Sequence, residues 1–135
     1  MLADDARINQ ITGTILAGAI EVHRIIGPGL LESPYVACLK FELTARGLGV
    51  VAQQPISMSY KSMQLEAVYR ADLIVEDTVV VEVKSVEGLT TLAKSQLLTY
   101  VRLASKPAGL LINFNVERLM DGVRRVLNTT SRPRR

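Results

Sequence analysis

The sequence predicts an α/β domain in which helices flank one mixed central sheet. Three observations support this prediction: two segments of helical periodicity come first, valine-rich strands follow, and a further helix separates these strands from another apolar run. The chain has 135 residues, 48% apolar and 21% charged, which suits one folded domain and not a disordered chain. We expect a single domain over residues 1–128 and a basic, flexible tail over residues 129–135.

Two helices are expected in the first third of the chain. Residues 8–26 carry apolar side chains at steps of three and four, the spacing of one helix face. Gly27-Pro28-Gly29 ends this helix, because proline cannot continue it and glycine adopts the cap geometry. The second helix should begin near Ser33-Pro34, since serine is a good N-cap and proline suits the first helical position, and should end at Gly47 and Gly49.

The spacing changes to that of strands at residue 50. Short strands are expected over residues 50–56 and 58–60, and a longer one over residues 64–75. Glu76-Asp77-Thr78 then turns the chain into a strand over residues 79–84, which is rich in valine and is expected near the sheet centre.

The rest of the chain is expected to form a helix, a strand and a helix. Residues 89–103 have helical spacing, and Pro107 follows as a breaker. Residues 109–114 are apolar without alternation, which is typical of a buried strand. Residues 116–128 are expected to form the final helix.

Composition excludes several functions. No apolar run approaches the roughly 18 residues of a membrane span, and the first residues do not form a secretory signal. Cys38 is the single cysteine, so we expect neither an internal disulfide nor a zinc site, and a cytoplasmic location. The net charge of +3 comes from three arginines in residues 131–135, which leave 13 basic and 13 acidic residues elsewhere. A neutral body with 4% aromatic residues is poor material for a base-stacking platform.

Charged side chains converge between Asp72 and Lys84. Because side chains alternate along a strand, Glu82 and Lys84 emerge on one face of a strand otherwise made of valine. A three-residue loop pairs position 72 with position 82, and a bulge near Asp72 would also bring the two carboxylates together. Such carboxylates repel unless a cation lies between them, and oxygen ligands suit Mg²⁺ or Mn²⁺. The alternative is an ion pair between Glu82 and Lys84 on a solvated face.

Three further side chains could complete this site. Lys84 could orient an attacking water or stabilise charge on a phosphate. Gln96 and Tyr100 are four residues apart and share one face of the next helix, where they could hold the phosphate or the water. Their alternative role is at the edge of the core.

The segment Gly29-Leu-Leu-Glu32-Ser-Pro-Tyr35 matches the motif of the GxxExxY family. Residues 19–24, 27–33 and 110–115 resemble other characteristic stretches of that family, and the resemblance covers about residues 8–128. The family is placed in the PD-(D/E)XK nuclease superfamily, whose fold is a restriction-endonuclease-like core. Ala71 stands where the superfamily name has proline.

The resemblance implies roles for individual residues. Asp72 and Glu82 would be metal-binding carboxylates, Lys84 the superfamily lysine and Glu32 a helix-borne acidic residue that binds the metal directly or through water. Gln96 and Tyr100 fall on the Gln-x-x-x-Tyr pattern of RecB-like nucleases. Glu21 is the alternative helical carboxylate.

Three functions are compatible with these observations. The first is a Mg²⁺-dependent (or Mn²⁺-dependent) nuclease that hydrolyses phosphodiester bonds in DNA or in RNA. The second is a catalytically inactive nucleic-acid-binding or regulatory module of the same fold, acting with a larger protein partner, which the neutral body favours. The third is a structural domain that oligomerises, a homodimer included, with Glu82 and Lys84 as a simple ion pair. No membrane contact is expected.

Overall fold

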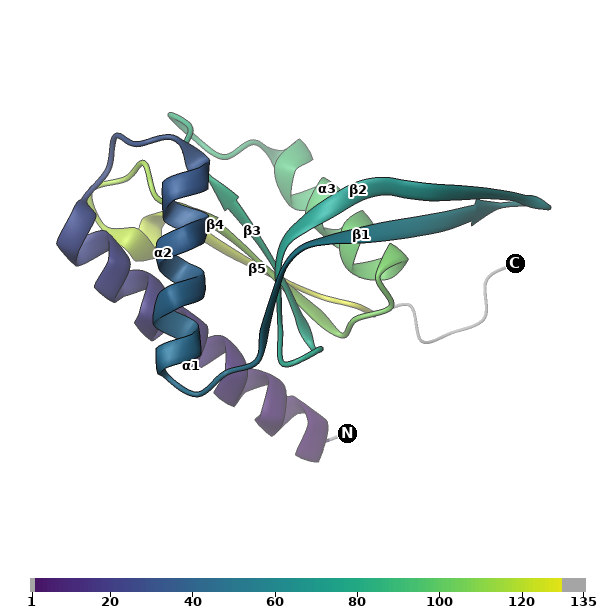
Figure 1. Cartoon of the computed structure of the whole chain (residues 1–135), viewed down its shortest axis with the longest axis horizontal. Coiled ribbons are helices and arrows are strands. Elements are labelled where there is room, and N and C mark those ends of the chain that lie inside the picture. Colours follow the sequence, from purple (N-terminus) through teal and green to yellow (C-terminus); the bar gives the residue numbers. More distant parts are fainter. Residues whose placement is uncertain (1, 130–135) are drawn as a thin grey trace.

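The computed structural model describes residues 2–129, so most of the predicted basic tail lies outside the described residues (Figure 1). The elements are helices α1 (Leu2–Ile26) and α2 (Glu32–Ala45), strands β1 (Val50–Tyr60), β2 (Met63–Val75) and β3 (Val79–Lys84), helix α3 (Thr91–Leu103), strand β4 (Ala108–Asn113), the short 3-10 helix η1 (Leu119–Gly122) and strand β5 (Val123–Leu127). The strands form one sheet in the order β1-β2-β3-β4-β5. Only the β3–β4 pair is parallel, so the predicted mixed α/β sheet is confirmed.

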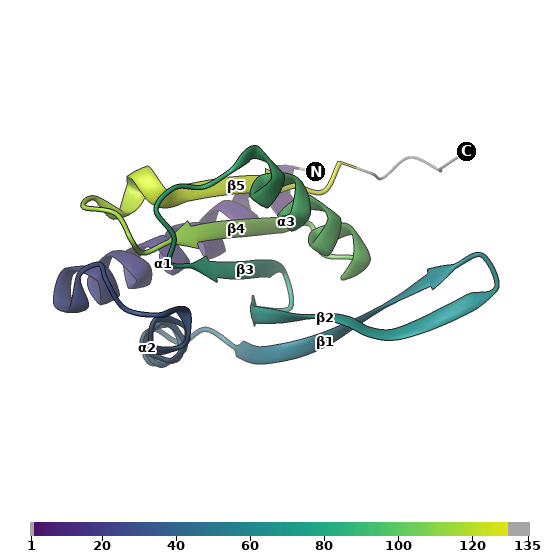
Figure 2. The same ribbon diagram turned by 90° about the horizontal axis from the view of Figure 1, so that it is seen from above.

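Helices cover both faces of the sheet (Figure 2). On one face, α1 and α2 pack Ile15 and Leu39 against alternate residues of β3 and β4. On the other face, Leu97 and Val101 of α3 pack against a second set of strand residues. Gly109 allows this close approach, because a Cβ there would lie 2.6 Å from Val101 Cγ2.

The prediction of a final helix over residues 116–128 is wrong. This segment forms η1 and then β5, which pairs antiparallel with β4 from Ile112↔Val123 to Ala108↔Leu127. The edge of β4 needs hydrogen-bond partners, and the β-branched Val123 and Val126 suit a strand. Long-range pairing therefore overrides the local helical spacing.

Other boundaries differ less. α1 begins six residues earlier than expected, and the two short strands expected over residues 50–60 are one strand whose register shifts between Ile56 and Met58. α2 begins at Glu32, so Ser33 lies inside its first turn and is not the N-cap. Thr90 caps α3 by accepting a hydrogen bond from Ala93 N–H.

β1 and β2 continue beyond the sheet as a two-stranded ribbon, visible at the right of Figures 1 and 2. We call residues 57–68 the arm. None of its side chains is buried, whereas the neighbouring Ile56 and Ala71 still pack with the α3 side of the core.

Candidate active site

The geometry of the site follows from the turn between β2 and β3. Glu76, Asp77 and Thr78 form the three-residue connection that the sequence predicts, and the strands pair from Val75↔Val79 to Leu73↔Val81. One further step in this register places Asp72 opposite Glu82.

At this position, hydrogen bonds to side-chain carboxylates replace those between the two backbones. Val83 N–H donates to Asp72 Oδ2 at 2.9 Å, and Asp72 N–H donates to Glu82 Oε2 at 3.4 Å. The two carboxylates therefore lie together at the fork where β2 leaves β3.

Asp72 also marks an irregularity in its own strand. Residues two apart in a strand normally share a face, but Ala71 packs on the α3 side and Leu73 on the α1–α2 side. The opposite residue in β1, Gln53, has a left-handed φ of 56° and is skipped in the strand pairing. The local distortion that the sequence reading allowed near Asp72 is present, together with the three-residue turn.

The fork is an unfavourable place for two negative charges. Glu82 is only 8% exposed. Burial raises the pKa of Glu82 to about 8, the Asp72 carboxylate adds to this rise, and the Asp72 N–H and the Lys84 charge oppose it. A divalent cation would favour the ionised pair, and two adjacent carboxylates are oxygen ligands of the kind that Mg²⁺ and Mn²⁺ take. The donor set therefore fits such an ion.

Lys84 lies beyond Glu82 on the same strand, half-buried, next to α3. Lys84 and Gln96 line a cavity of about 250 Å³ at the start of α3. Among the ion pairs of residues 2–129, none involves Lys84, so the structure does not show the direct Glu82–Lys84 pair of the structural alternative.

Tyr100 stands near the fork and packs against a residue that the sequence did not suggest. Its ring stacks on that of Tyr69, with centroids 3.7 Å apart and an interplanar angle of 11°. Tyr69 Oη donates to the Tyr100 carbonyl at 3.4 Å. Burial raises the pKa of both phenols, and the Glu82 charge is the next cause for each, so both rings lie within the field of the site. No motif marks Tyr69, because its contact comes from the folding of β2 against α3.

Glu32 is not brought into this group. It is exposed in the first turn of α2. Within the described part of the chain, no three His, Cys, Asp or Glu side chains are placed to hold a metal together. The loop before Glu32 does reach the end of β3, since Ser85 Oγ donates to the Leu30 carbonyl. Glu21, the alternative acid, pairs with Arg24 at 3.0 Å.

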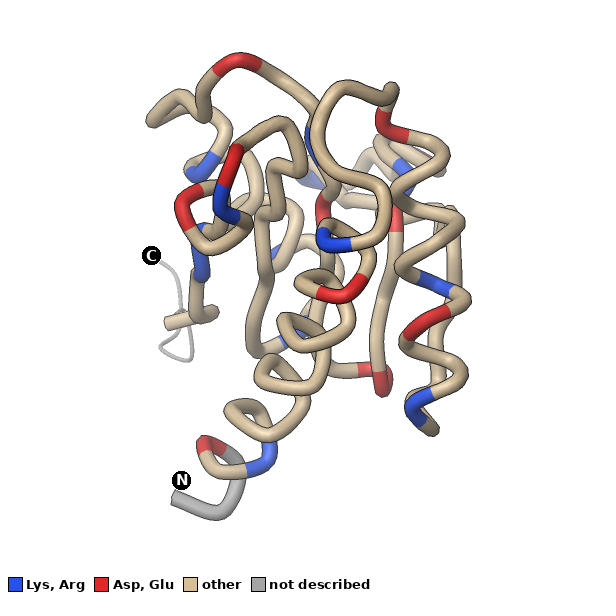
Figure 3. Tube along the Cα trace, turned by 90° about the vertical axis from the view of Figure 1, so that its left-hand side faces the viewer, with Lys and Arg blue, Asp and Glu red and all other residues tan. Residues whose placement is uncertain are grey.

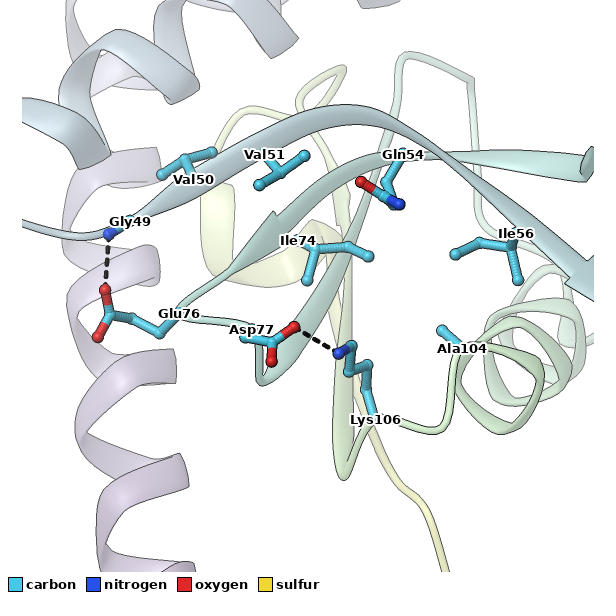
Figure 4. Close-up of a pocket in the computed structure, with 10 residues that line it drawn as sticks. All are labelled: Gly49, Val50, Val51, Gln54, Ile56, Ile74, Glu76, Asp77, Ala104 and Lys106. Carbon is cyan, nitrogen blue, oxygen red and sulfur yellow. Dashed lines mark hydrogen bonds and ion pairs between the residues drawn. The ribbon is translucent and has the colours of Figure 1, made fainter.

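A larger cavity lies elsewhere in the fold. It has about 690 Å³ and lies between the start of β1, the β2–β3 turn and the end of α3 (Figure 4). Its charged groups are already partnered: Asp77 pairs with Lys106 at 2.5 Å, and Glu76 accepts from Gly49 N–H at 2.6 Å. It contains none of the predicted site residues.

The mixed sheet brings Asp72 and Glu82 together where β2 leaves β3, and Lys84 follows two residues later on β3. The chain matches the family model described as the PD-(D/E)XK nuclease superfamily over residues 9–126, and it belongs to that superfamily. No curated protein and no solved structure gives a significant match. No helix in residues 2–129 is long and apolar enough to cross a membrane.

Proposed function

We propose that the chain is a cytoplasmic, divalent-metal-dependent nuclease of the GxxExxY family that hydrolyses phosphodiester bonds in DNA or RNA. The observation that carries this proposal is the buried Glu82 beside Asp72, a carboxylate pair that an ion would stabilise. Superfamily membership supports the reaction class and a nucleic-acid substrate.

The GxxExxY motif also has a physical role here. Tyr35 is fully buried, stacks on Phe114 at 4.6 Å, and donates from its hydroxyl to the Gly27 carbonyl at 2.6 Å. Gly29 has a left-handed φ of 110°. The tyrosine thus holds the turn before α2, which is a reason for the spacing of glycine and tyrosine in this motif.

Asp72 and Glu82 would hold Mg²⁺ or Mn²⁺. When bound, the ion supplies Lewis-acid polarisation of a phosphate and activation of water. Glu32 is the further ligand that the resemblance to the GxxExxY family implies, acting directly or through water. Its role remains a prediction.

The chain's own groups would position the substrate. Lys84 offers an ammonium group without an ion-pair partner among residues 2–129, and Gln96 offers an amide that lines the same cavity. These donors suit a phosphate oxygen or the attacking water. Tyr100 stacks on Tyr69 and lies close enough to feel the charge of Glu82.

A cleavage assay tests the proposal. Plasmid DNA, single-stranded DNA and RNA are incubated with the protein and Mg²⁺ or Mn²⁺. We expect metal-dependent cleavage that falls at least 100-fold in Lys84→Ala and in Glu82→Gln. Glu66→Gln, an exposed acid in the arm, is the matched control and should retain activity. Absence of cleavage with both metals, or cleavage unaffected by Lys84→Ala, would contradict the proposal.

The inactive binding module is the second candidate, because the charge of the described chain is mixed. Figure 3 shows acidic and basic residues interspersed along the trace. Salt-dependent nucleic-acid binding without cleavage and without a metal requirement would favour this function.

A further inference from the structure

One face of the arm is apolar and open to solvent. Met58 of β1 lies opposite Leu65 of β2, and side chains directly opposite each other in an antiparallel pair share a face. At the next apolar rung, Tyr60 lies opposite Met63. Tyr60 is 54% exposed and Met63 is 51% exposed. We call these four side chains the apolar face of the arm, and a two-stranded ribbon is marginally stable when such a face has nothing packed on it.

The opposite face of the arm is polar. Ser57 Oγ donates to Glu66 Oε1 at 3.3 Å, and Ser59 Oγ donates to Gln64 Oε1 at 2.5 Å. These cross-strand pairs satisfy one another, so the polar face needs no further partner. Ser59 directly precedes Tyr60 in β1 and therefore offers a matched control position on the other face.

The apolar face leads to the proposed metal site. Alternation along β1 places Ile56 and Tyr60 on the same side of the strand, and Ile56 lies opposite Tyr69 in β2. The Tyr69 ring stacks on Tyr100, and Tyr69 lies three residues before Asp72 in β2. Apolar and aromatic side chains thus run from the fork along the arm, which extends away past α3 (Figure 1).

Aromatic residues are few in this chain but are concentrated along this line. Of the four tyrosines, Tyr100 and Tyr69 stand at the fork and Tyr60 at the far end of β1, while Tyr35 is buried in the core. The Lys61 ammonium lies over the Tyr60 ring, 5.4 Å from its centroid, and supplies a cation beside it. The low aromatic content of the chain therefore does not exclude a local surface for stacking bases.

We propose that the apolar face of the arm binds the bases of a single-stranded nucleic acid whose phosphodiester enters the fork. This inference rests on the proposed function and specifies its substrate as a single strand. Every base has a π-face, and stacking on aromatic side chains binds bases with little regard to sequence. Between Ile56 and Tyr60, β1 rises by about 13 Å, at about 3.3 Å per residue. This length gives room for about four bases stacked at about 3.4 Å.

The chemistry of the face favours a single strand over a duplex. In a duplex the bases stack on one another and the outer surface carries phosphates, which require cations. The four side chains of the apolar face are uncharged, and Lys61 is the single cation of the arm. A single strand can turn its bases toward the apolar face and its phosphates toward Lys61 and the solvent. A protein partner or a second copy of the chain would also cover apolar side chains, but the direct connection of this face to the carboxylate fork favours the substrate.

Fluorescence anisotropy with labelled oligonucleotides of about ten nucleotides tests the proposal, in EDTA so that binding is measured without cleavage. We expect single-stranded DNA or RNA to bind at least tenfold more tightly than a DNA duplex of the same length. Tyr60→Ala should weaken binding of the single strand by about tenfold, and Tyr60→Phe, which keeps the ring, should retain it. Ser59→Ala is the matched control and should bind as the wild type does. Equal melting temperatures would show that all variants fold.

An abasic strand of the same length separates stacking from charge, because it keeps the phosphates and lacks the bases. We expect the wild type to bind it about as weakly as Tyr60→Ala binds the normal strand, and Tyr60→Ala to have no further effect on it. Equal affinity of the wild type for the normal and the abasic strand would show that the bases do not contact the arm.

Other outcomes would also overturn the proposal: no binding of the single strand, equal affinity for single strand and duplex, or equal binding by Tyr60→Ala and Ser59→Ala. A wild-type dimer in light scattering that Tyr60→Ala dissociates would assign the apolar face to a second copy and would overturn it too. The nuclease proposal fails separately. Tyr60-dependent binding without cleavage in Mg²⁺ or Mn²⁺ would contradict the nuclease and support the arm, whereas equal cleavage of single-stranded DNA by the wild type and Tyr60→Ala would contradict the arm alone.

Discussion

The two halves of β2 form a contrast within one strand. Leu73, Ile74 and Val75 are buried between β1 and β3, while Met63, Leu65 and Val68 in the arm are exposed. Asp72 stands at the border, where β3 stops pairing with the strand. The difference shows that the proposed active-site carboxylates occupy the place where a packed strand becomes a free ribbon.

The position of Asp72 at this border both fixes the backbone of the site and leaves space for two carboxylates. On the packed side, three ladder positions fix the backbone that leads to Asp72. On the free side, the departure of β2 leaves backbone N–H groups unpaired by the ladder, and the carboxylates accept from them. A continuous ladder would have used those N–H groups and left no space for two acids.

The largest expected effect comes from removing a side chain in the packed half. Leu73→Ala opens a cavity in the core and should cost about 2–5 kcal/mol in the free energy of unfolding. Leu65→Ala in the arm should cost about 1 kcal/mol or less, because that side chain is partly in water. Urea denaturation of both variants measures the contrast. Equal losses would show that the arm is as tightly packed as the sheet.

The pH dependence of stability should reveal Glu82 in the metal-free protein. Its pKa rises from 4.5 in the unfolded chain to about 8 in the fold. Below pH 4.5 both states hold the proton, so the ionisation of Glu82 takes nothing from the free energy of unfolding. Between these values only the folded state keeps the proton, and stability falls as pH rises, by on the order of a few kcal/mol in total.

Glu82→Gln should remove this fall in the free energy of unfolding with pH, as measured by urea titrations in EDTA at about pH 5 and about pH 9. Glu66→Gln in the arm replaces an exposed acid and should leave the slope unchanged. If Glu66→Gln removed the pH dependence and Glu82→Gln did not, the carboxyl with the raised pKa would lie in the arm and not at the fork.

Gly109→Ala should have a smaller effect on the packed side. A Cβ at this position would meet Val101 at 2.6 Å and Leu97 at 3.1 Å, so α3 must shift from the sheet, at a cost of about 1–3 kcal/mol. Gly88→Ala has open space and serves as the control. Thermal unfolding of both variants tests this, and equal melting temperatures would contradict the tight contact.

The smallest effect is expected where the ribbon meets α3. Tyr69→Phe keeps the ring that stacks on Tyr100 and removes the 3.4 Å hydrogen bond, so it should cost about 1 kcal/mol or less. Tyr69→Ala also removes the stack and should cost more. Melting temperatures that fall in the order wild type, Tyr69→Phe, Tyr69→Ala would agree with this prediction. A larger loss of stability in Tyr69→Phe than in Tyr69→Ala would contradict it.

Local patterns in the sequence predicted the centre of the fold. Strand alternation and a three-residue turn were enough to bring Asp72 and Glu82 together, because both depend on residues close in the chain. The segment over residues 116–128 failed for the opposite reason, since its strand depends on the distant β4. Tyr69 was missed for the same reason, and Glu32 carries a motif whose role the described contacts do not test.

Binding of Mn²⁺ by isothermal titration calorimetry tests the central claim most directly, because it asks whether the fork holds a divalent ion. We predict one saturable site in the wild type and in Glu66→Gln, and at least a tenfold weaker affinity in Asp72→Asn and in Glu82→Gln. Equal Mn²⁺ affinity in all four proteins would contradict the placement of the metal between Asp72 and Glu82.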